Sequence, residues 1–201
     1  MSTYSAGMMS VPYLFIETQN TARLLVDGLS VQEAKEKVLS DNLYQMNSAY
    51  RAERYFNAIV KRLKALPSDL LPSIAQGDVA QAKLLLVVAI ACTDLLFFEF
   101  LHQVFRPALN MGSKTLDNAD INLFFYQKRR ESVLVAGWAD STIRKLRSSF
   151  LSVLSGAGLL NRTRAPRTII PGYLPESIIK QLIDAGLSPY LASVLGDAYV
   201  S

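Results

Sequence analysis

The sequence is poor in the residues that most often carry enzyme chemistry. Its 201 residues include a single cysteine, Cys92, and a single histidine, His102. One cysteine excludes an intramolecular disulfide, and one histidine beside one cysteine supplies too few ligands for a closed zinc site. No phosphate-binding loop, nucleophile elbow or kinase signature occurs. We therefore expect no enzyme, with no catalytic residues, no cofactor and no metal site, and interpret both residues as packing groups.

The sequence also lacks an apolar run long enough to cross a membrane. Its most apolar stretch is residues 83–105, but the uninterrupted run covers only residues 84–92. A spanning helix needs roughly 20 apolar residues, and Asp94 and Glu99 would each be costly inside a bilayer. The N-terminus has neither a basic region nor an uninterrupted apolar one, so a signal peptide is not expected. We predict one central buried helix of a soluble protein, ending before Pro107.

What the sequence does contain is helical periodicity. Half of the residues are hydrophobic and 19% are charged, which is enough apolar material for a sizeable core. Ser30 and Glu33 stand at capping-box spacing, and Asp78 can cap the long apolar helix. The polar residues 108–118, with Gly112, form the candidate linker. We therefore predict a mainly all-α protein with a helical bundle over residues 1–110 and a second unit over 111–201.

The second unit has its own order of elements. Residues 119–132 predict a helix ending in cations, and residues 133–139 a short apolar stretch whose Trp138 packs inside. A helix with Asp140 or Ser141 as its cap follows. Residues 159–174 predict two extended pieces around a basic turn, before two terminal helices. A helix, a turn, a second helix and a two-stranded flap is the order of a winged helix-turn-helix.

Positive charge is concentrated in this second unit. The whole chain has a net charge of +4. Residues 128–167 hold nine cations against two anions, Glu131 and Asp140, whereas the rest of the chain holds 12 cations and 15 anions. Such asymmetry is typical of a nucleic-acid surface. The candidate nucleic-acid-binding residues are Lys128, Arg129, Arg130, Ser141, Arg144, Lys145, Arg147, Ser148, Arg162, Arg164 and Arg167.

The helix that begins near Asp140 separates its apolar and polar residues. Its predicted buried stripe comprises Ile143, Leu146, Phe150, Val153 or Leu154, and Ala157. Its opposite side comprises Ser141, Arg144, Lys145, Ser148, Ser152 and Ser155. Serines are indifferent helix formers, but their small hydroxyl groups allow close approach to a phosphate backbone and donate to it. We predict that this side binds nucleic acid; the alternative is an ordinary solvated face.

The kind of partner is less sharply indicated. RNA sites usually offer aromatic rings for base stacking, and the basic region has only Tyr126, Trp138 and the neighbouring Tyr173. A winged helix more often places its second helix in a DNA major groove. Double-stranded DNA is therefore preferred. The alternatives are an adaptor whose cationic face meets an acidic protein, and RNA binding by the helical N-terminal half.

Several short stretches resemble one family. They are "YSAG" at residues 4–7, "NLYQ" at 42–45, "KRLKALP" at 61–67, "FFEFLHQVF" at 97–105, "WADSTIRKL" at 138–146 and "GLL" at 158–160. Together they resemble the BrxA family of bacterial BREX phage-defence systems. The resemblance spans nearly the whole chain.

The resemblance implies a cytoplasmic, all-helical protein with a NusB-like N-terminal bundle and a winged helix-turn-helix that binds double-stranded DNA. It also implies that the protein works beside the methyltransferase, phosphatase-like and ATPase components of the system. It assigns no individual residue. The candidate residues named above follow from charge and helix face alone.

Overall fold

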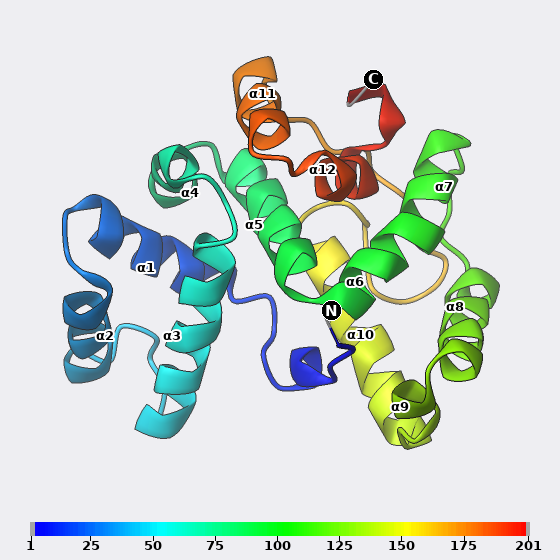
Figure 1. Ribbon diagram of the computed structural model, residues 1–201, viewed down its shortest axis with the longest axis horizontal. Coiled ribbons are helices and arrows are strands. Elements are labelled where there is room, and N and C mark those ends of the chain that lie inside the picture. Colours follow the sequence, from blue (N-terminus) through cyan, green and yellow to red (C-terminus); the bar gives the residue numbers. More distant parts are fainter. Residues whose placement is uncertain (1–2, 200–201) are drawn as a thin grey trace.

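The computed structural model describes residues 3–199, and its regular elements are helices joined by turns (Figure 1). Within that range no β-strand forms, only two isolated β-bridges. The mainly helical class predicted from the sequence is confirmed. The first part of the chain forms α1 (Phe15–Val26), α2 (Val31–Ser40), α3 (Ala49–Leu63), α4 (Leu71–Ala75) and α5 (Val79–Thr93). The remainder forms α6 (Leu95–Phe100), α7 (Arg106–Asn110), α8 (Asn118–Glu131), α9 (Val133–Ala136), α10 (Asp140–Gly156), α11 (Glu176–Asp184) and α12 (Ser188–Leu195).

Helices α1–α4 lie together at one end of the molecule, and local capping sets their boundaries (Figure 1). The chain leaves α1 through Gly28, whose φ of 95° lies in the left-handed region that favours glycine. The predicted capping box before α2 is confirmed, since the Ser30 hydroxyl accepts from the Glu33 N–H at 3.2 Å and the Glu33 carboxylate accepts from the Ser30 N–H at 2.8 Å. Ser48 caps α3, since its hydroxyl accepts from the Arg51 N–H at 3.3 Å.

Helix α5 is the central helix of the fold, and nine of its fifteen residues are buried. Asp78 caps it as predicted. The prediction of one helix over residues 83–105 is wrong, because the chain breaks at Asp94. This residue is extended (φ −133°, ψ 106°), and its carboxylate accepts from the Phe97 N–H at 2.9 Å, which caps α6. In residues 3–199 no single helix is both long and apolar enough to span a membrane; Val79–Thr93 and Leu95–Asn110 reach that length only together, across a bend of 114°.

The helical path also continues past Pro107, where it was predicted to have ended. Leu101–Phe105 form a π-helical turn, and Pro107 stands in the first turn of α7. Proline has no N–H, and its ring crowds the carbonyl four residues earlier in an α-helix. A π turn widens the helix locally, and we infer that this widening lets the chain pass Pro107 without breaking.

Helix α10 shows the predicted separation of faces, but not the predicted cap. Leu146, Phe150, Val153 and Leu154 are buried, and Ile143 is half-buried. The helix begins at Asp140, with Ala139 in the cap position and no side-chain cap. The prediction of Asp140 or Ser141 as the cap is therefore wrong. Asp140 instead lies in the first turn, where a carboxylate interacts favourably with the helix dipole.

Beyond α10, three short pieces of chain lie side by side. Leu160 and Ile169 form an antiparallel bridge, and Thr168 forms a second bridge with Thr115. Hydrogen bonds from the Asn161 N–H to the Thr168 carbonyl and from the Ile170 N–H to the Leu159 carbonyl extend the first pairing. The predicted pair of extended pieces is thus present, although neither is long enough to form a strand. The predicted terminal helices are α11 and α12.

One hydrophobic core joins the two halves of the chain. Phe150 of α10 contacts three aromatic rings on α6 and α8, with centroid distances of 5.1 Å to Phe97, 5.2 Å to Phe100 and 5.9 Å to Phe125. Helix α12 packs against α5 and α7. The core therefore extends across residue 110, where the sequence suggests a boundary. Trp138 is half-buried and packs against this core.

Candidate nucleic-acid interface

The outward side of α10 carries the exposed part of the basic region. Ser141, Arg144, Lys145 and Ser148 are all exposed, as is Ser152 one turn farther along. No hydrogen bond or ion pair to another described residue occupies the side chains of Arg144 and Lys145. The α10 face, as we call these five residues, therefore offers two cations and three hydroxyl groups to a ligand. Those are the groups that contact a phosphate backbone.

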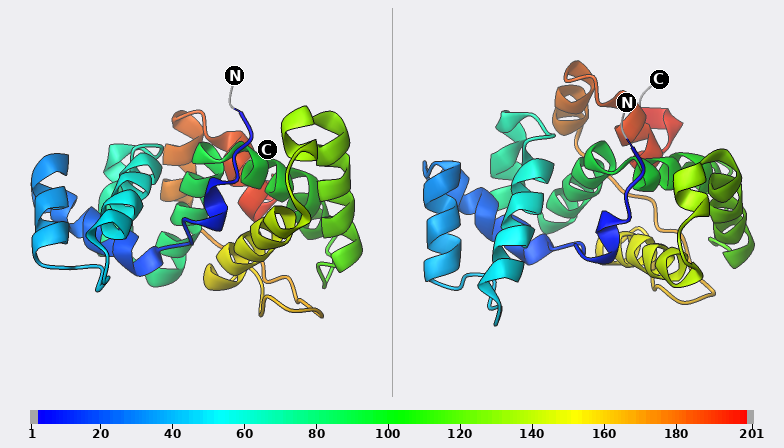
Figure 2. Two further views of the ribbon diagram at one scale, coloured as in Figure 1. Left: turned by 90° about the horizontal axis from the view of Figure 1, so that it is seen from below. Right: turned by 60° about the horizontal axis from the view of Figure 1, so that its bottom comes forward.

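The loop after α10 adds two further cations. Arg162 and Arg164 are exposed, and they lie in residues 161–167, which run beside α10 in both panels of Figure 2. Arg167 is different, because only 4% of it is exposed. Its guanidinium donates to the carbonyls of Thr163 at 2.7 Å and Leu116 at 3.2 Å, and to Asn118 Oδ1 at 2.9 Å. Arg167 is therefore an anchor of this loop, not an open phosphate contact.

Lys128, another candidate residue, lies inside the protein. It is 3% exposed, and its ammonium is 2.8 Å from Glu99 and 2.8 Å from Glu131. The Tyr4 hydroxyl donates to the same Glu99 oxygen at 2.8 Å, so that this cluster ties the N-terminal segment to α6 and α8. Burial and the bond to Glu99 raise the pKa of Tyr4. Two carboxylates neutralise Lys128 within the fold, and we exclude it from the surface.

Arg129, Arg130 and Arg147 differ in whether other protein groups already accept hydrogen bonds from their guanidinium groups. Arg129 is half-buried and donates to the Trp138 carbonyl at 2.9 Å and to Asp140 at 2.7 Å. Arg147 is half-buried, and its guanidinium donates hydrogen bonds to the side-chain oxygens of Asn118 and Asn122 on α8. Only Arg130 remains exposed, over the ring of Tyr126. The residues that the fold leaves open are thus Arg130, Ser141, Arg144, Lys145, Ser148, Arg162 and Arg164.

Lys114 also lies near this surface, although it is not among the residues predicted from the sequence. It is exposed, and its carbonyl accepts from the Ile169 N–H at 3.0 Å, which places it beside the basic loop. Lys114 belongs to the stretch interpreted as a linker, and its pairing partner is 55 residues away in sequence (169 − 114). No local pattern could have indicated this proximity.

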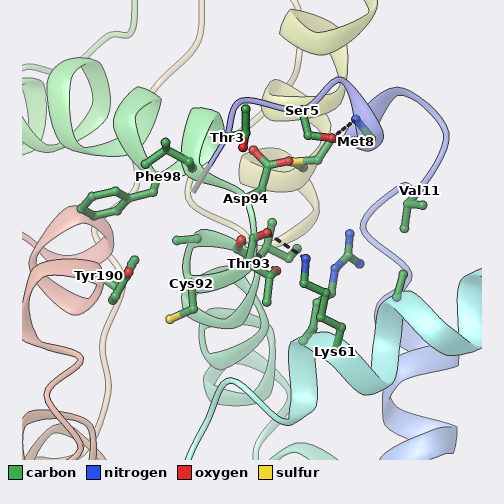
Figure 3. A pocket seen from close by; sticks show the side chains of 16 residues that line it. Thr3, Ser5, Met8, Val11, Lys61, Cys92, Thr93, Asp94, Phe98 and Tyr190 are labelled. Carbon is green, nitrogen blue, oxygen red and sulfur yellow. Dashed lines mark hydrogen bonds between the residues drawn. The ribbon is translucent and has the colours of Figure 1, made fainter. Parts of the chain in front are cut away.

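A cavity of about 350 Å³ lies elsewhere, between the N-terminal segment, α3 and the bend at Asp94 (Figure 3). Its charged groups already have protein partners. Lys61 reaches the Thr93 carbonyl, the Asp94 carboxylate caps α6, and Arg62 donates to the carbonyls of Pro12 and Tyr13. Burial raises the pKa of Asp94 and lowers that of Arg62 to about 10. The Arg62 bonds hold the N-terminal segment in place, and we find no catalytic arrangement in the cavity.

Comparison with known proteins places the chain in a family. The family model for BrxA matches residues 2–186. The chain belongs to the BrxA family. A curated relative from Bacillus cereus (strain H3081.97), "BREX protein BrxA", is 32% identical over 96% of this chain and 97% of its own length. A second "BREX protein BrxA", from Escherichia coli O9:H4 (strain HS), is 25% identical over 85% of this chain and 80% of its own length.

A solved structure supports the fold of this family member. The crystal structure of an uncharacterized protein from Magnetospirillum magneticum matches with a TM-score of 0.80 over 98% of this chain and all of the other. Sequence identity in that match is 18%. The family model and the curated relatives confirm, at the level of the family, the resemblance identified from short stretches such as "WADSTIRKL".

Proposed function

We propose that this chain is a non-enzymatic, double-stranded-DNA-binding component of a BREX phage-defence system. The observation that carries the proposal is the α10 face beside the exposed arginines of the following loop. Five cations, namely Arg130, Arg144, Lys145, Arg162 and Arg164, are exposed on α8, α10 and this loop. Clustered cations and hydroxyl groups on an exposed helix are what binding to a phosphate backbone requires. Family membership supports the defence role.

In this proposal the second half of the chain is a winged helix-turn-helix-like module. Its elements would be α6–α7, the bridged residues 114–116, α8, α9, α10 and the paired residues around the basic loop. Helix α10 would be the recognition helix and residues 161–167 the wing. The module would begin near Leu95 and not at residue 111. Helices α1–α5 would then form the NusB-like bundle that the family resemblance implies.

The proposal predicts binding that depends strongly on salt. Each neutralised phosphate contributes about −0.9 to the slope of log K against log salt concentration, so five cations give at most about −4.5. The test is fluorescence anisotropy with a duplex of about 20 base pairs. Replacing Arg144 and Lys145 with alanine should weaken binding about tenfold and reduce the slope by about 1.8.

The matched control removes two exposed cations elsewhere, Lys64 and Lys180. This pair should change affinity little, and the thermal unfolding midpoint should be nearly unchanged in both double variants. Equal binding by wild type and the Arg144/Lys145 variant would refute the proposal. Competition with structured RNA separates duplex DNA from RNA as the ligand.

A second candidate function is a protein-interaction adaptor. The observation that favours it is a set of exposed apolar residues on α8 and α9, with Val133 94% exposed, Tyr126 59%, Leu123 53% and Leu134 47%. Such residues are typical of contact surfaces when they lie together. The partners would be the methyltransferase, phosphatase-like or ATPase components. Co-purification of a partner lost on Val133→Asp, without any DNA binding at near-physiological salt, would favour this function.

A further inference from the structure

A second basic face lies on α3. Arg51 and Arg54 are exposed, and the neighbouring Tyr50 is 77% exposed. The only carboxylate between residues 48 and 64 is that of Glu53, which pairs with Lys35 at 2.6 Å. No acidic group on the helix itself therefore remains to neutralise these arginines. We name Tyr50, Arg51 and Arg54 the α3 face.

The segment of residues 8–13 is held against α3 on one of its sides. Arg54 donates to the Ser10 carbonyl at 3.0 Å. Arg62, which is buried, donates to the carbonyls of Pro12 at 3.1 Å and Tyr13 at 3.2 Å. Hydrogen bonds from two arginines of one helix fix the course of this segment along α3.

On its other side the same segment packs against α10. Met8, Met9, Pro12 and Tyr13 line a groove of about 330 Å³, whose opposite wall is Lys145, Ser148, Ser149, Ser152 and Val153. The Tyr13 ring covers Gly156, where an added Cβ would lie 3.0 Å from the ring. The Tyr13 hydroxyl donates to the Lys83 carbonyl at 2.7 Å. A single short segment therefore lies between α3 and α10, and it contacts both helices (Figure 2).

We propose that the α3 face is a second phosphate-contacting surface for the same duplex that the α10 face binds. The proposal rests on the proposed function. DNA would cross the segment of residues 8–13, with Lys145 on one side of it and Arg54 on the other. The N-terminal bundle would then contribute directly to DNA binding.

Charge favours a duplex as the occupant. Arginine and tyrosine side chains are among the commonest donors to phosphate oxygens. The α3 face covers residues 50–54, which is about 6 Å along the helix at 1.5 Å per residue. That length corresponds to about two base-pair steps of 3.4 Å, so the face can contact neighbouring phosphates of one strand.

Lys61 is not part of this surface. Its ammonium lies 3.5 Å from the Thr93 carbonyl and lines the cavity that also contains Asp94 (Figure 3). A neighbouring carboxylate lowers the attraction of such a cation for an anion. The proposal therefore concerns Arg51 and Arg54, at the N-terminal end of α3.

The test replaces both arginines with glutamine, which removes the positive charge and keeps a polar side chain. On a duplex of about 20 base pairs, Arg51→Gln with Arg54→Gln should weaken binding about tenfold and reduce the salt slope by about 1.8. Circular dichroism should show an unchanged unfolding midpoint.

Three outcomes would overturn the proposal. The first is wild-type affinity of the glutamine variant while Arg144→Ala with Lys145→Ala still weakens binding; the proposed function would survive. The second is an equal loss in the Lys64→Ala/Lys180→Ala control, which would indicate an effect of net charge alone. The third is the absence of duplex binding by the wild type, which would refute the proposed function as well.

Discussion

Removal of the Lys128 ammonium tests whether this residue holds the fold together or binds DNA. Its side chain is 4% exposed, and it pairs with Glu99, which is 21% exposed, and with Glu131, which is 56% exposed. Deleting one partner of a buried ion pair costs about 3–5 kcal/mol, because the other charge stays buried without compensation. Partial solvation of Glu99 and Tyr4 hydrogen bonding reduce that cost, so Lys128→Met should lower the free energy of unfolding by about 3 kcal/mol.

The assay is urea denaturation at neutral pH, followed by circular dichroism, with DNA affinity measured in parallel. For a chain of this size, 3 kcal/mol corresponds to a fall of roughly 6–12 °C in the unfolding midpoint. Glu131→Gln is the control and should cost less than about 1 kcal/mol, because the Glu131 carboxylate is 56% exposed and Glu99 still pairs with Lys128. Unchanged stability of Lys128→Met together with tenfold weaker DNA binding would refute the assignment of Lys128 to the interior.

The same cluster predicts a pH dependence. Burial works to lower the pKa of Lys128, but hydrogen bonds to Glu131 and Glu99 outweigh it and raise that pKa above its ordinary value. The stabilisation is therefore fully present below the unfolded lysine pKa of about 10.4 and is lost as the pH rises through the higher pKa of the folded state. Wild type should lose stability above about pH 10.4 more steeply than Lys128→Met does.

Three further perturbations test other parts of the fold. Asp94→Ala should lower the free energy of unfolding by about 1 kcal/mol, because it removes the cap of α6. Asp94→Asn should be as stable as wild type at neutral pH, since asparagine also caps helices and burial already disfavours the carboxylate. Urea titration measures both free energies. Burial raises the pKa of Cys92 to about 12, so its thiol should react with an aromatic disulfide reagent at pH 8 much more slowly in the native than in the unfolded protein, and equal rates would contradict this. Phe150→Ala should cost about 3–5 kcal/mol by opening the aromatic core, whereas Tyr126→Ala, at an exposed ring, should cost under about 0.5 kcal/mol; a similar loss in both would contradict the packing.

The sequence predicted α10 well because its apolar residues repeat every three or four positions. That period requires no knowledge of the neighbouring helices. The break at Asp94 was not predictable in the same manner. Helix α5 is buried on all sides, so its sequence has no alternation of apolar and polar faces, and no change in that pattern marks where the helix ends. Asp94 became recognisable as a cap only once the backbone placed its carboxylate at the Phe97 N–H.

The sequence predicted the region of the candidate site more reliably than it predicted which residues of that region are exposed. Counting charge located the basic stretch, and Ser141, Arg144, Lys145 and Ser148 are exposed as the helical period predicts. Counting could not separate these from Lys128 or Arg167. The partners of those two residues, Glu99 and Leu116, lie 29 (128 − 99) and 51 residues away in the sequence. A cation becomes structural through contacts that only the tertiary fold creates.

The occupied cations also determine where the open ones lie. Arg167 anchors the loop that presents Arg162 and Arg164, because its guanidinium binds the Thr163 carbonyl within the loop and the Leu116 carbonyl outside it. Arg147 joins α10 to the asparagines of α8 and so fixes the rotation of the helix that carries Arg144. Replacing an occupied arginine would therefore displace a binding surface as well as remove a charge. On α10, only substitutions at the open positions separate the loss of phosphate contacts from displacement of the helix. The Arg144/Lys145 pair therefore decides the proposed function, and Arg147 is left intact.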